Sequence, residues 1–489
     1  MSNENPPTGS SGSIAEGDSS EDPGRSSGRV SGAAAGDPKA REQRLRSMPV
    51  GPLLTSLSLP AMAAMFINAL YNLVDAIFVG QAVGTEGMAA LSLAFPIQML
   101  IGAVGLMFGV GGASMASRFL GAGRREDADR TLGTAMVFVL ILGLITFSLL
   151  QIFLDEVLIF VGATEGTLPL ARDYARIVLF GFIPLSMAMT ANNFIRAEGN
   201  ARMSMIIMMT GAITNLILDP IYIFVFDWGV QGAALATITG QTLNFILGYR
   251  YLLSRRSNYH IKLRYLVPRI DLVKEISGLG VATFVRQIGT SAFLIVVNNL
   301  IRSYSDAPGT MIAVMGVINR LMMFSLMPLF GLVQGMQPIA GYNYGARLFH
   351  RVKEVVNTAF RRGMIIATLA FAMFMLFPGA LMRAFGSDPD FIERGTYFLR
   401  VVFLMVALVP LQIVGAAYFQ ALGKMLPAFF LSTSRQFILL LPMVVIFAAI
   451  GGIPLMAWAF PAADFITIII TMVWFRIDSA RLFTEPAAS

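Results

Sequence analysis

Long apolar segments separated by short polar connections recur along the chain from residue 52 to residue 475. A helix needs roughly 20 mainly apolar residues to cross about 30 Å of hydrocarbon, and twelve segments reach that length. They lie near 52–79, 89–113, 131–153, 171–195, 203–226, 231–250, 276–301, 310–339, 363–382, 396–420, 427–449 and 455–475. The pattern predicts an all-α integral membrane protein with twelve transmembrane helices.

The second half of this pattern repeats the first, 222 to 226 residues further along the chain. The matched glycines and prolines are Gly121 with Gly345, Pro184 with Pro410, Gly199 with Gly423 and Pro220 with Pro442. Each half holds six predicted spans, and an even number means that both halves enter the membrane from the same side. The halves are therefore expected to be two six-helix lobes, related as a parallel repeat about an axis along the membrane normal.

The connections and the two ends divide the chain further. Residues 1–47 are rich in Ser, Gly, Pro and charge and lack an apolar run, so we expect a disordered cytoplasmic tail. The further divisions are an N-terminal lobe over 48–253, a basic cytoplasmic linker over 254–275, a C-terminal lobe over 276–476 and a cytoplasmic tail over 477–489. The first residues lack the apolar run of a cleavable signal, so the first helix is expected to stay in the mature protein.

Lysines and arginines are shared unevenly between the predicted loops of the two sides. The loops of one side hold nineteen, and those of the other side hold three, namely Arg302, Arg383 and Arg394. Because positive residues favour the cytoplasmic side, we expect a protein of the inner cell membrane with both termini in the cytoplasm. This topology, with contact to anionic lipid, explains the net charge of +7 without nucleic-acid binding.

Composition supports the membrane interpretation and restricts the chemistry. The chain is 56% hydrophobic and 13% charged, whereas soluble domains are about 25% charged. It has no cysteine, which excludes disulfides, thiolate zinc sites and cysteine nucleophiles. We expect no metal or cofactor, and an integral-membrane enzyme, one alternative, has no evident cluster of catalytic residues in this sequence.

Two carboxylates stand out inside the predicted spans of the first half, because a charge at the centre of a span costs roughly 2.5 to 3.5 kcal/mol. Asp75 ends a polar stripe with Asn68, Tyr71 and Asn72, whose spacing places all four on one helix face. Asp219 lies one turn after Asn215 and shares its face. If Asp75 and Asp219 lie at one depth, they form a site for protons or a small cation, as ion-coupled antiport requires.

Other residues of the first half are candidates for the same region. They are Thr237, Gln241 and Asn244 on one face of the sixth span, Asn192 in the fourth span, and Met187 and Met208. Methionine is flexible and polarizable, so the two methionines are candidates to line a cavity that accepts varied ligands. The alternative for the amides is hydrogen bonding between helices, worth about 0.6 kcal/mol each.

Pro60 lies inside the first predicted span, fifteen residues before Asp75. Proline removes a backbone donor and leaves a carbonyl unpaired, which makes a bending point in a helix. Protonation at Asp75 and bending at Pro60 would then be linked along one helix. The alternative is a static kink.

The polar residues of the second half differ in character. They are Arg286, Gln287, Asn298, Asn299, Asn319, Arg320, Gln334, Gln337, Gln412, Arg435, Gln436 and Asp464. Leu441 stands at the position that matches Asp219, so we expect the coupling chemistry in the N-terminal lobe. The sequence assigns no role to Arg286, Arg320, Arg435 and Asp464.

Four segments carry a resemblance to a known family: SLPAMAAMFINALYNLVDAIFVGQAVG, GVGGASMASRFLGAGRREDA, NNFIRAEGNARMSM and NLILDPIYIF. On these, residues 52–476 resemble the multidrug and toxic compound extrusion (MATE) family, on its prokaryotic DinF-like or MepA-like side. The resemblance implies twelve helices in two lobes around a V-shaped cleft. It also implies export of cationic or amphipathic drugs in exchange for H⁺ or Na⁺.

The resemblance assigns roles to residues named above. It implies that Asp75, Asn215, Asp219, Thr237 and Asn192 couple the ion and that Pro60 bends the first helix. Asn68, Tyr71, Asn72, Gln241, Asn244, Met187 and Met208 are the candidates for the substrate cavity.

One departure from the family pattern bears on the coupling ion. Members that bind Na⁺ in the C-terminal lobe carry a glutamate in the seventh helix, where this chain has Arg286 and Gln287. The departure favours a proton over Na⁺. We expect a monomer with small-molecule drugs as substrates, and a flippase for lipid-linked precursors, with extra helices and a strongly cationic cavity, is the alternative.

Overall fold

The computed structural model describes residues 37–484, without the side chains of residues 483–484, of Ser291 and of most residues between 71 and 90. Every regular element in that range is helical. The first half contains α2 (Pro38–Ser47), α3 (Val50–Gly121), α4 (Arg125–Ile152), α5 (Leu154–Val161), α6 (Leu168–Phe180), α7 (Phe182–Ala197), α8 (Ala201–Pro220), the π-helix η1 (Ile221–Val225) and α9 (Gly229–Leu252).

The second half has the same kind of helices. It contains the 3₁₀ turn η2 (Leu263–Leu266), α10 (Ile270–Tyr304), α11 (Pro308–Gly345), α12 (Phe349–Leu376), α13 (Pro378–Arg383), α14 (Pro389–Val402), the 3₁₀ turn η3 (Val406–Leu408), α15 (Val409–Ala421), α16 (Met425–Thr433), the π-helix η4 (Ser434–Leu440), α17 (Leu441–Met456) and α18 (Ala459–Thr484). We call α3–α9 the N-lobe and α10–α18 the C-lobe.

Ten stretches of the described helices are long and apolar enough to cross a membrane, or eleven if the bent pair α6 and α7, which meet at 48°, is one span. They correspond to eleven of the twelve predicted spans. The twelfth, predicted at 231–250, is the helix α9; its 24 residues are enough to cross, but it is more polar than the others and does not qualify. Thr237, Gln241 and Asn244 contribute to that polarity.

α3 contains two predicted spans within one element of 72 residues, which would extend about 108 Å if straight. It is not straight, because a Cβ on Gly335 would touch Ser58 and one on Gly341 would touch Ser117. The two glycines are only about 9 Å apart along α11. The chain therefore reverses direction between the spans Val50–Leu70 and Leu91–Gly121.

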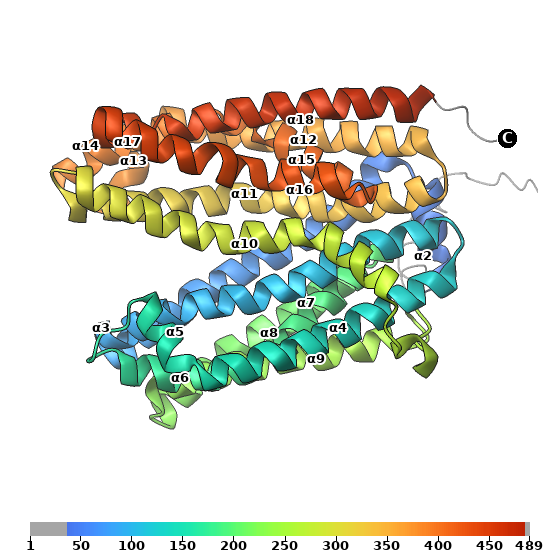
Figure 1. Ribbon diagram of the computed structural model, residues 1–489, viewed down its shortest axis with the longest axis horizontal. Coiled ribbons are helices and arrows are strands. Elements are labelled where there is room, and N and C mark those ends of the chain that lie inside the picture. The colour runs from blue at the N-terminus through green and yellow to red at the C-terminus, as the bar shows by residue number, and fades with distance from the viewer. Residues whose placement is uncertain (1–36, 485–489) are drawn as a thin grey trace, which may run out of the picture.

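The two lobes lie against each other at one end of the molecule and diverge toward the other end, with α3 running between them (Figure 1). One apolar core combines N-lobe residues such as Leu54 with C-lobe residues such as Met336 and Ile339. A second core, around Phe293 and Phe374, draws only on the C-lobe. The lobes are therefore joined through shared buried side chains at the end where α2 lies.

The internal repeat is visible in the contacts of two matched glycines. A Cβ on Gly121 would lie 1.9 Å from the carbonyl oxygen of Tyr342, and one on Gly345 would lie 1.9 Å from that of Arg118. Gly121 and Gly345 are 224 residues apart, and so are Arg118 and Tyr342. Each helix thus crosses its repeat partner in the same way, as the predicted axis along the membrane normal requires.

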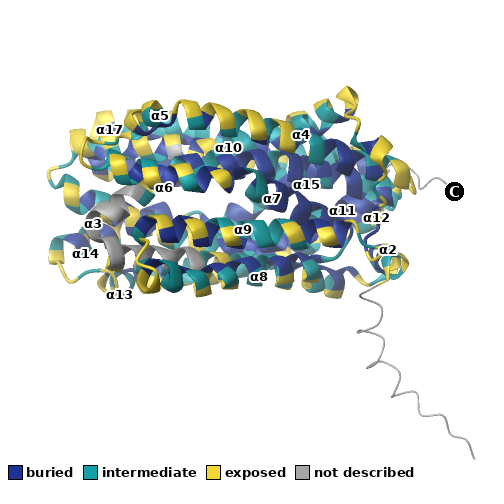
Figure 2. Ribbon diagram, turned by 90° about the horizontal axis from the view of Figure 1, so that it is seen from below, coloured by how far each residue is buried: buried dark blue, intermediate teal, exposed yellow. Residues whose placement is uncertain are grey.

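Exposed positions follow the outer faces of the long helices (Figure 2). Many are large and apolar, among them Ile145 in α4, Leu369 in α12 and Ile446 in α17. Apolar side chains on the outside of a bundle suit a hydrocarbon environment, because lipid chains are as apolar as the side chains themselves.

The structure corrects two predicted boundaries. Residues 38–47, predicted as part of a disordered tail, form α2, which Asp37 caps by accepting from the backbone N–H of Lys39. Residues 477–484, predicted as a tail, continue α18, and Leu482 there is buried. Both segments are polar on average, but single residues in them find buried partners, which composition does not reveal. Residues 1–36 and 485–489 lie outside the described part.

Candidate functional site

Three predicted residues of the N-lobe meet in a buried polar cluster between α8 and α9. Asp219 is 0% exposed, Asn215 3% and Thr237 6%. The Nδ2 of Asn215 donates to Oδ1 of Asp219 at 3.2 Å and to Oγ1 of Thr237 at 3.4 Å. The Asn215 amide therefore links the carboxylate to the neighbouring helix, and its own Oδ1 is buried without a hydrogen bond in the described part of the chain.

The local backbone explains this geometry. α8 ends at Pro220 and continues as the π-helix η1, a local widening that often occurs at functional sites. A Cβ on Gly240 would lie 2.7 Å from the carbonyl oxygen of Gly211 and 3.3 Å from Cβ of Asn215. Only a glycine permits this approach of α9 to α8, which brings Thr237 within reach of Asn215.

Asn192, predicted to belong with these residues, lies apart from them. Its Nδ2 donates to the carbonyl of Ala188 at 3.0 Å, and its Oδ1 accepts from Ser204 at 3.0 Å. Ser204 is eleven residues before Asn215 on α8, about 16 Å along the helix. In this structure Asn192 joins α7 to α8 near the other end of α8, so the placement next to Asn215 is wrong.

The residues predicted for the substrate cavity fill helix interfaces. The Oε1 of Gln241 lies 2.4 Å from where a Cβ on Gly181 would be, and the side chain of Asn244 packs equally closely on Gly211. Met187 is buried, where its sulfur accepts from the hydroxyl of Tyr249.

The remaining predicted residues are placed as follows: Met208 lies beside Arg196 of α7, Pro60 is half-buried within α3, and Asn68 is exposed. The side chains of Tyr71, Asn72 and Asp75 lie outside the described residues. Thus only Asn215, Asp219 and Thr237 are brought together as predicted.

The first helix runs beside the end of α8. The ring of Phe78 meets that of Phe224 edge-on, with centroids 6.2 Å apart. Phe78 is three residues beyond Asp75, and Phe224 is five residues beyond Asp219. The contact fixes the relative height of the two helices.

A small polar cavity of about 20 Å³ between the lobes was not expected from the sequence. Its lining is Val110, Ala113, Ser114, Ser117, Asn193, Arg196, Ala197, Gln334, Gln337 and Pro338. Arg196 had been counted with the loops, but it lies in α7 and donates to Asn193 and Ser204, which are neutral. Close by, Gln337 of α11 donates to Gln420 of α15 at 2.9 Å. The i, i+3 spacing of Asn193 and Arg196 was the only available signal.

The unassigned C-lobe residues are partly brought together as well. Arg286, Gln412, Arg435, Gln436 and Asp464 line one cavity of about 120 Å³. Within it, Nε of Arg435 donates to Asp464, so the open question of the partner of Arg435 is answered. Arg320 is exposed and does not line this cavity.

Comparison with known families decides the affiliation. A family model described as MatE matches residues 60–221 and 282–446, one stretch in each half of the chain. The chain belongs to the MatE family. The matched stretches begin at Pro60 and include the Asn215 and Asp219 cluster and the linings of both cavities in large part.

Curated and solved members of the MatE family cover nearly the whole chain. The multidrug export protein MepA of Staphylococcus aureus (strain MSSA476) is 26% identical over 438 residues, which are 89% of this chain and 96% of MepA. The structure of the MATE multidrug transporter DinF-BH in complex with rhodamine 6G has 40% identity and a TM-score of 0.83, covering 90% of this chain and 98% of that one. An outward-facing multidrug resistance MATE family transporter has 26% identity and a TM-score of 0.82, covering 92% and 97%. The predicted resemblance is confirmed, and the two-lobe fold agrees with these structures.

Proposed function

We propose that this MatE protein is a secondary efflux transporter that exports cationic or amphipathic drugs in exchange for protons. The observation that carries the proposal is the fully buried carboxylate of Asp219 in a membrane helix. A carboxylate in a span is costly and tends to mark an ion pathway. The relatives whose names say multidrug export, with matches over both lobes, support drugs as the cargo.

The donors around Asp219 favour a proton as the coupling ion. The amide nitrogen of Asn215, not its oxygen, faces the carboxylate and Thr237. A Na⁺ ion would instead need several oxygen ligands turned toward one point. In the C-lobe the seventh span presents Arg286 rather than a carboxylate, which offers Na⁺ no second site.

The first helix supplies the moving part of the proposed cycle. Pro60 interrupts the hydrogen bonding of α3, and the contact of Phe78 with Phe224 couples this helix to the end of α8. Asp75 would then share protons with Asp219 across this contact. A change of charge at that point would bias the helix between a straight and a bent form.

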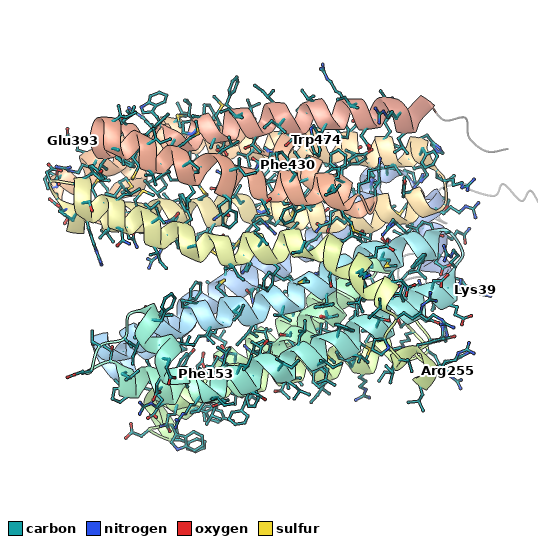
Figure 3. All side chains as sticks on the ribbon, viewed as in Figure 1. Lys39, Phe153, Arg255, Glu393, Phe430 and Trp474 are labelled. Carbon is teal, nitrogen blue, oxygen red and sulfur yellow. The ribbon has the colours of Figure 1, made fainter. Side chains whose placement is uncertain are left out.

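Orientation in the membrane follows from charge. The described ends of the chain lie at one end of the molecule (Figure 1), where Lys39 and Arg255 also lie, whereas Glu393 lies at the opposite end (Figure 3). The excess of basic loops at the first end supports a cytoplasmic position for it in the inner membrane. Export would then proceed toward the end at which the lobes diverge.

Reconstituted protein tests the proposal directly. Proteoliposomes with a pH-sensitive dye inside are given rhodamine 6G, the compound named in the DinF-BH complex, with and without Na⁺. We expect this rhodamine to drive proton movement in Na⁺-free buffer, at the rate seen with Na⁺. Uptake or release of rhodamine that requires Na⁺ and leaves the internal pH unchanged would overturn proton coupling. Absence of rhodamine transport under any gradient would overturn the transport of this cation.

A further inference from the structure

The C-lobe cavity lies where three helical segments depart from regular geometry. The chain between α14 and α15 breaks at η3, α16 gives way to the π-helix η4, and Pro328 interrupts α11. These breaks leave a space of about 120 Å³. Irregular backbone at membrane depth is tolerated where it lines a cavity, which is how transporter sites are commonly built.

The charges that line this cavity do not balance. Arg435 donates to Asp464, and that pair is neutral as a whole. Arg286 also lines the cavity, with its guanidinium carbon 5.6 Å from the ring centre of Phe330. Among the described side chains, no carboxylate lies within ion-pair distance of Arg286, so the cavity carries one excess positive charge.

A buried neutral acceptor lies on the same lining. Gln412 is 7% exposed, and its Oε1 is buried without a hydrogen bond in the described part of the chain. A buried acceptor left unpaired costs about 1–3 kcal/mol, and an unpaired cation in a membrane protein costs more. One cavity thus holds an unmet need for an anion and an unmet need for a donor.

The rest of the lining is apolar and partly aromatic. It includes Met322, Leu326, Phe330, Phe403 and Val406. A cavity of about 150 Å³ lined by apolar side chains can hold benzene. The available space therefore suits one ring with a small polar group, or the end of a longer molecule.

We propose that this cavity binds aromatic carboxylates, with the carboxylate on Arg286, the ring beside Phe330 and Phe403, and any donor of the ligand on Gln412. A planar guanidinium accepts a carboxylate through two parallel hydrogen bonds, which adds specificity to charge. The site lies in the C-lobe, and its assignment does not depend on Asp219. It adds anionic and zwitterionic compounds to the cationic ones of the proposed function.

Benzoate and its uncharged analogue benzamide test the proposal. Binding of radiolabelled benzoate to the purified full-length protein is measured by scintillation proximity, with benzamide, inorganic phosphate and phosphatidylglycerol as competitors. We expect benzoate to be displaced by unlabelled benzoate at least tenfold more effectively than by benzamide. Equal competition by benzamide would show that charge plays no part and would overturn the proposal.

Variants locate the site. Arg286→Gln should weaken benzoate binding at least tenfold, whereas Arg320→Gln, which changes an exposed arginine of α11 outside the cavity, should leave it unchanged. Arg286→Gln removes an unpaired charge, so its Tm should not fall. Benzoate binding that survives in folded Arg286→Gln would overturn the assignment. If that variant fails to fold, Arg286→Lys keeps the charge but not the planar fork, and unchanged affinity there would exclude the two-bond contact.

The competitors separate the two sources of an anion. Stronger displacement by phosphatidylglycerol than by unlabelled benzoate would identify a lipid phosphate as the occupant and would overturn the carboxylate assignment. Displacement by inorganic phosphate at equal concentration would have the same meaning. We expect neither, because the cavity is narrow and lined with aromatic rings that match a flat ligand.

Discussion

Arg41 of α2 and Glu198, the residue that follows α7, form a buried ion pair in which Nη1 lies 2.9 Å from Oε1. Their side chains are 3% and 0% exposed. Glu198 also accepts from Tyr251, from Ser257 at 3.0 Å and from the backbone N–H of Asn258 at 2.7 Å. A segment that precedes the first span is thus anchored in the loops of the N-lobe.

The same short helix reaches the C-lobe. The carbonyl oxygen of Leu45 accepts from Asn343 of α11 at 3.0 Å, and that of Met48 accepts from Arg351 of α12 at 2.7 Å. Leu45 itself packs on Gly199, in the loop that contains Glu198. α2 therefore ties the two lobes together at the end where they meet.

Arg41→Gln is expected to destabilise the protein by about 3–5 kcal/mol, because it leaves the carboxylate of Glu198 buried without its cation. Thermal unfolding in detergent measures the loss. Lys39→Gln is the matched control, since Lys39 is an exposed cation two residues earlier in the same helix, and its Tm should be unchanged. Equal Tm values for the two variants would show that the ion pair adds nothing.

The same pair predicts a dependence on pH. Burial raises the pKa of Glu198, and Arg41 opposes that shift. A raised pKa means that the folded state binds a proton more readily than the unfolded state, so this contribution to stability is complete below the unfolded-state pKa of 4.5 and is lost as pH rises through the folded-state pKa. Without Arg41 the shift should grow. The Tm deficit of Arg41→Gln should therefore shrink as pH falls toward 4.5, and a deficit that stays constant would contradict this assignment.

Deletions test the role of α2 as a whole. Removing residues 1–36 should leave Tm and transport unchanged, because none of the α2 contacts described above involves them. Removing residues 1–47 should lower Tm and alter transport, since it takes away Arg41 and Leu45. Transport and unfolding of both truncated proteins decide the matter, and an intact second deletion would mean that α2 is dispensable.

Gly345→Ala should destabilise the closed end of the lobes by about 1–3 kcal/mol, the usual cost of overpacking. The new Cβ would lie 1.9 Å from the backbone carbonyl of Arg118, which cannot rotate away. Gly316→Ala is the control on the same helix, because nothing lies within 4 Å of a Cβ there. Its Tm should stay level or rise, and a similar fall in both variants would indicate an effect of helix backbone instead of lobe contact.

Asp219→Asn should abolish rhodamine-driven proton movement and leave the protein folded in the membrane. Asparagine keeps the volume and hydrogen bonds with Asn215 and Thr237 but does not titrate. We expect the same of Asp75→Asn. Asp173→Asn, which changes an exposed aspartate of α6, should transport normally. Wild-type exchange rates in either of the first two variants would mean that the residue only holds helices together.

Accessibility labelling tests the orientation. A cysteine at Glu165, in the loop between α5 and α6, should react with an impermeant reagent from outside the cell, and one at Arg256 or Arg351 only from inside. The chain has no native cysteine, so each label is unambiguous. Labelling of Glu165 from the cytoplasm would reverse the orientation and with it the direction of export.

The sequence by itself determined the features that depend on neighbours in the chain. The lengths of apolar segments specify the spans, because hydrocarbon thickness sets a minimum length. The spacing of Asn215 and Asp219 puts them one turn apart on α8, and their hydrogen bond follows from the helix alone. The repeat of Gly121 at Gly345 likewise predicted the paired lobes before their crossing was seen.

Only the tertiary structure decided which distant residues meet. Glu198 lies 157 residues from Arg41, and no local pattern joins them, so a polar segment was taken for a disordered tail. Asn192 was placed with Asn215 by resemblance, but the way α7 packs on α8 sets it beside Ser204 instead. Arg286 acquired its excess charge because Asp464 is already held by Arg435 from another helix. Helix periodicity fixes which side chains share a face, whereas the packing of one helix on another fixes which of those faces meet.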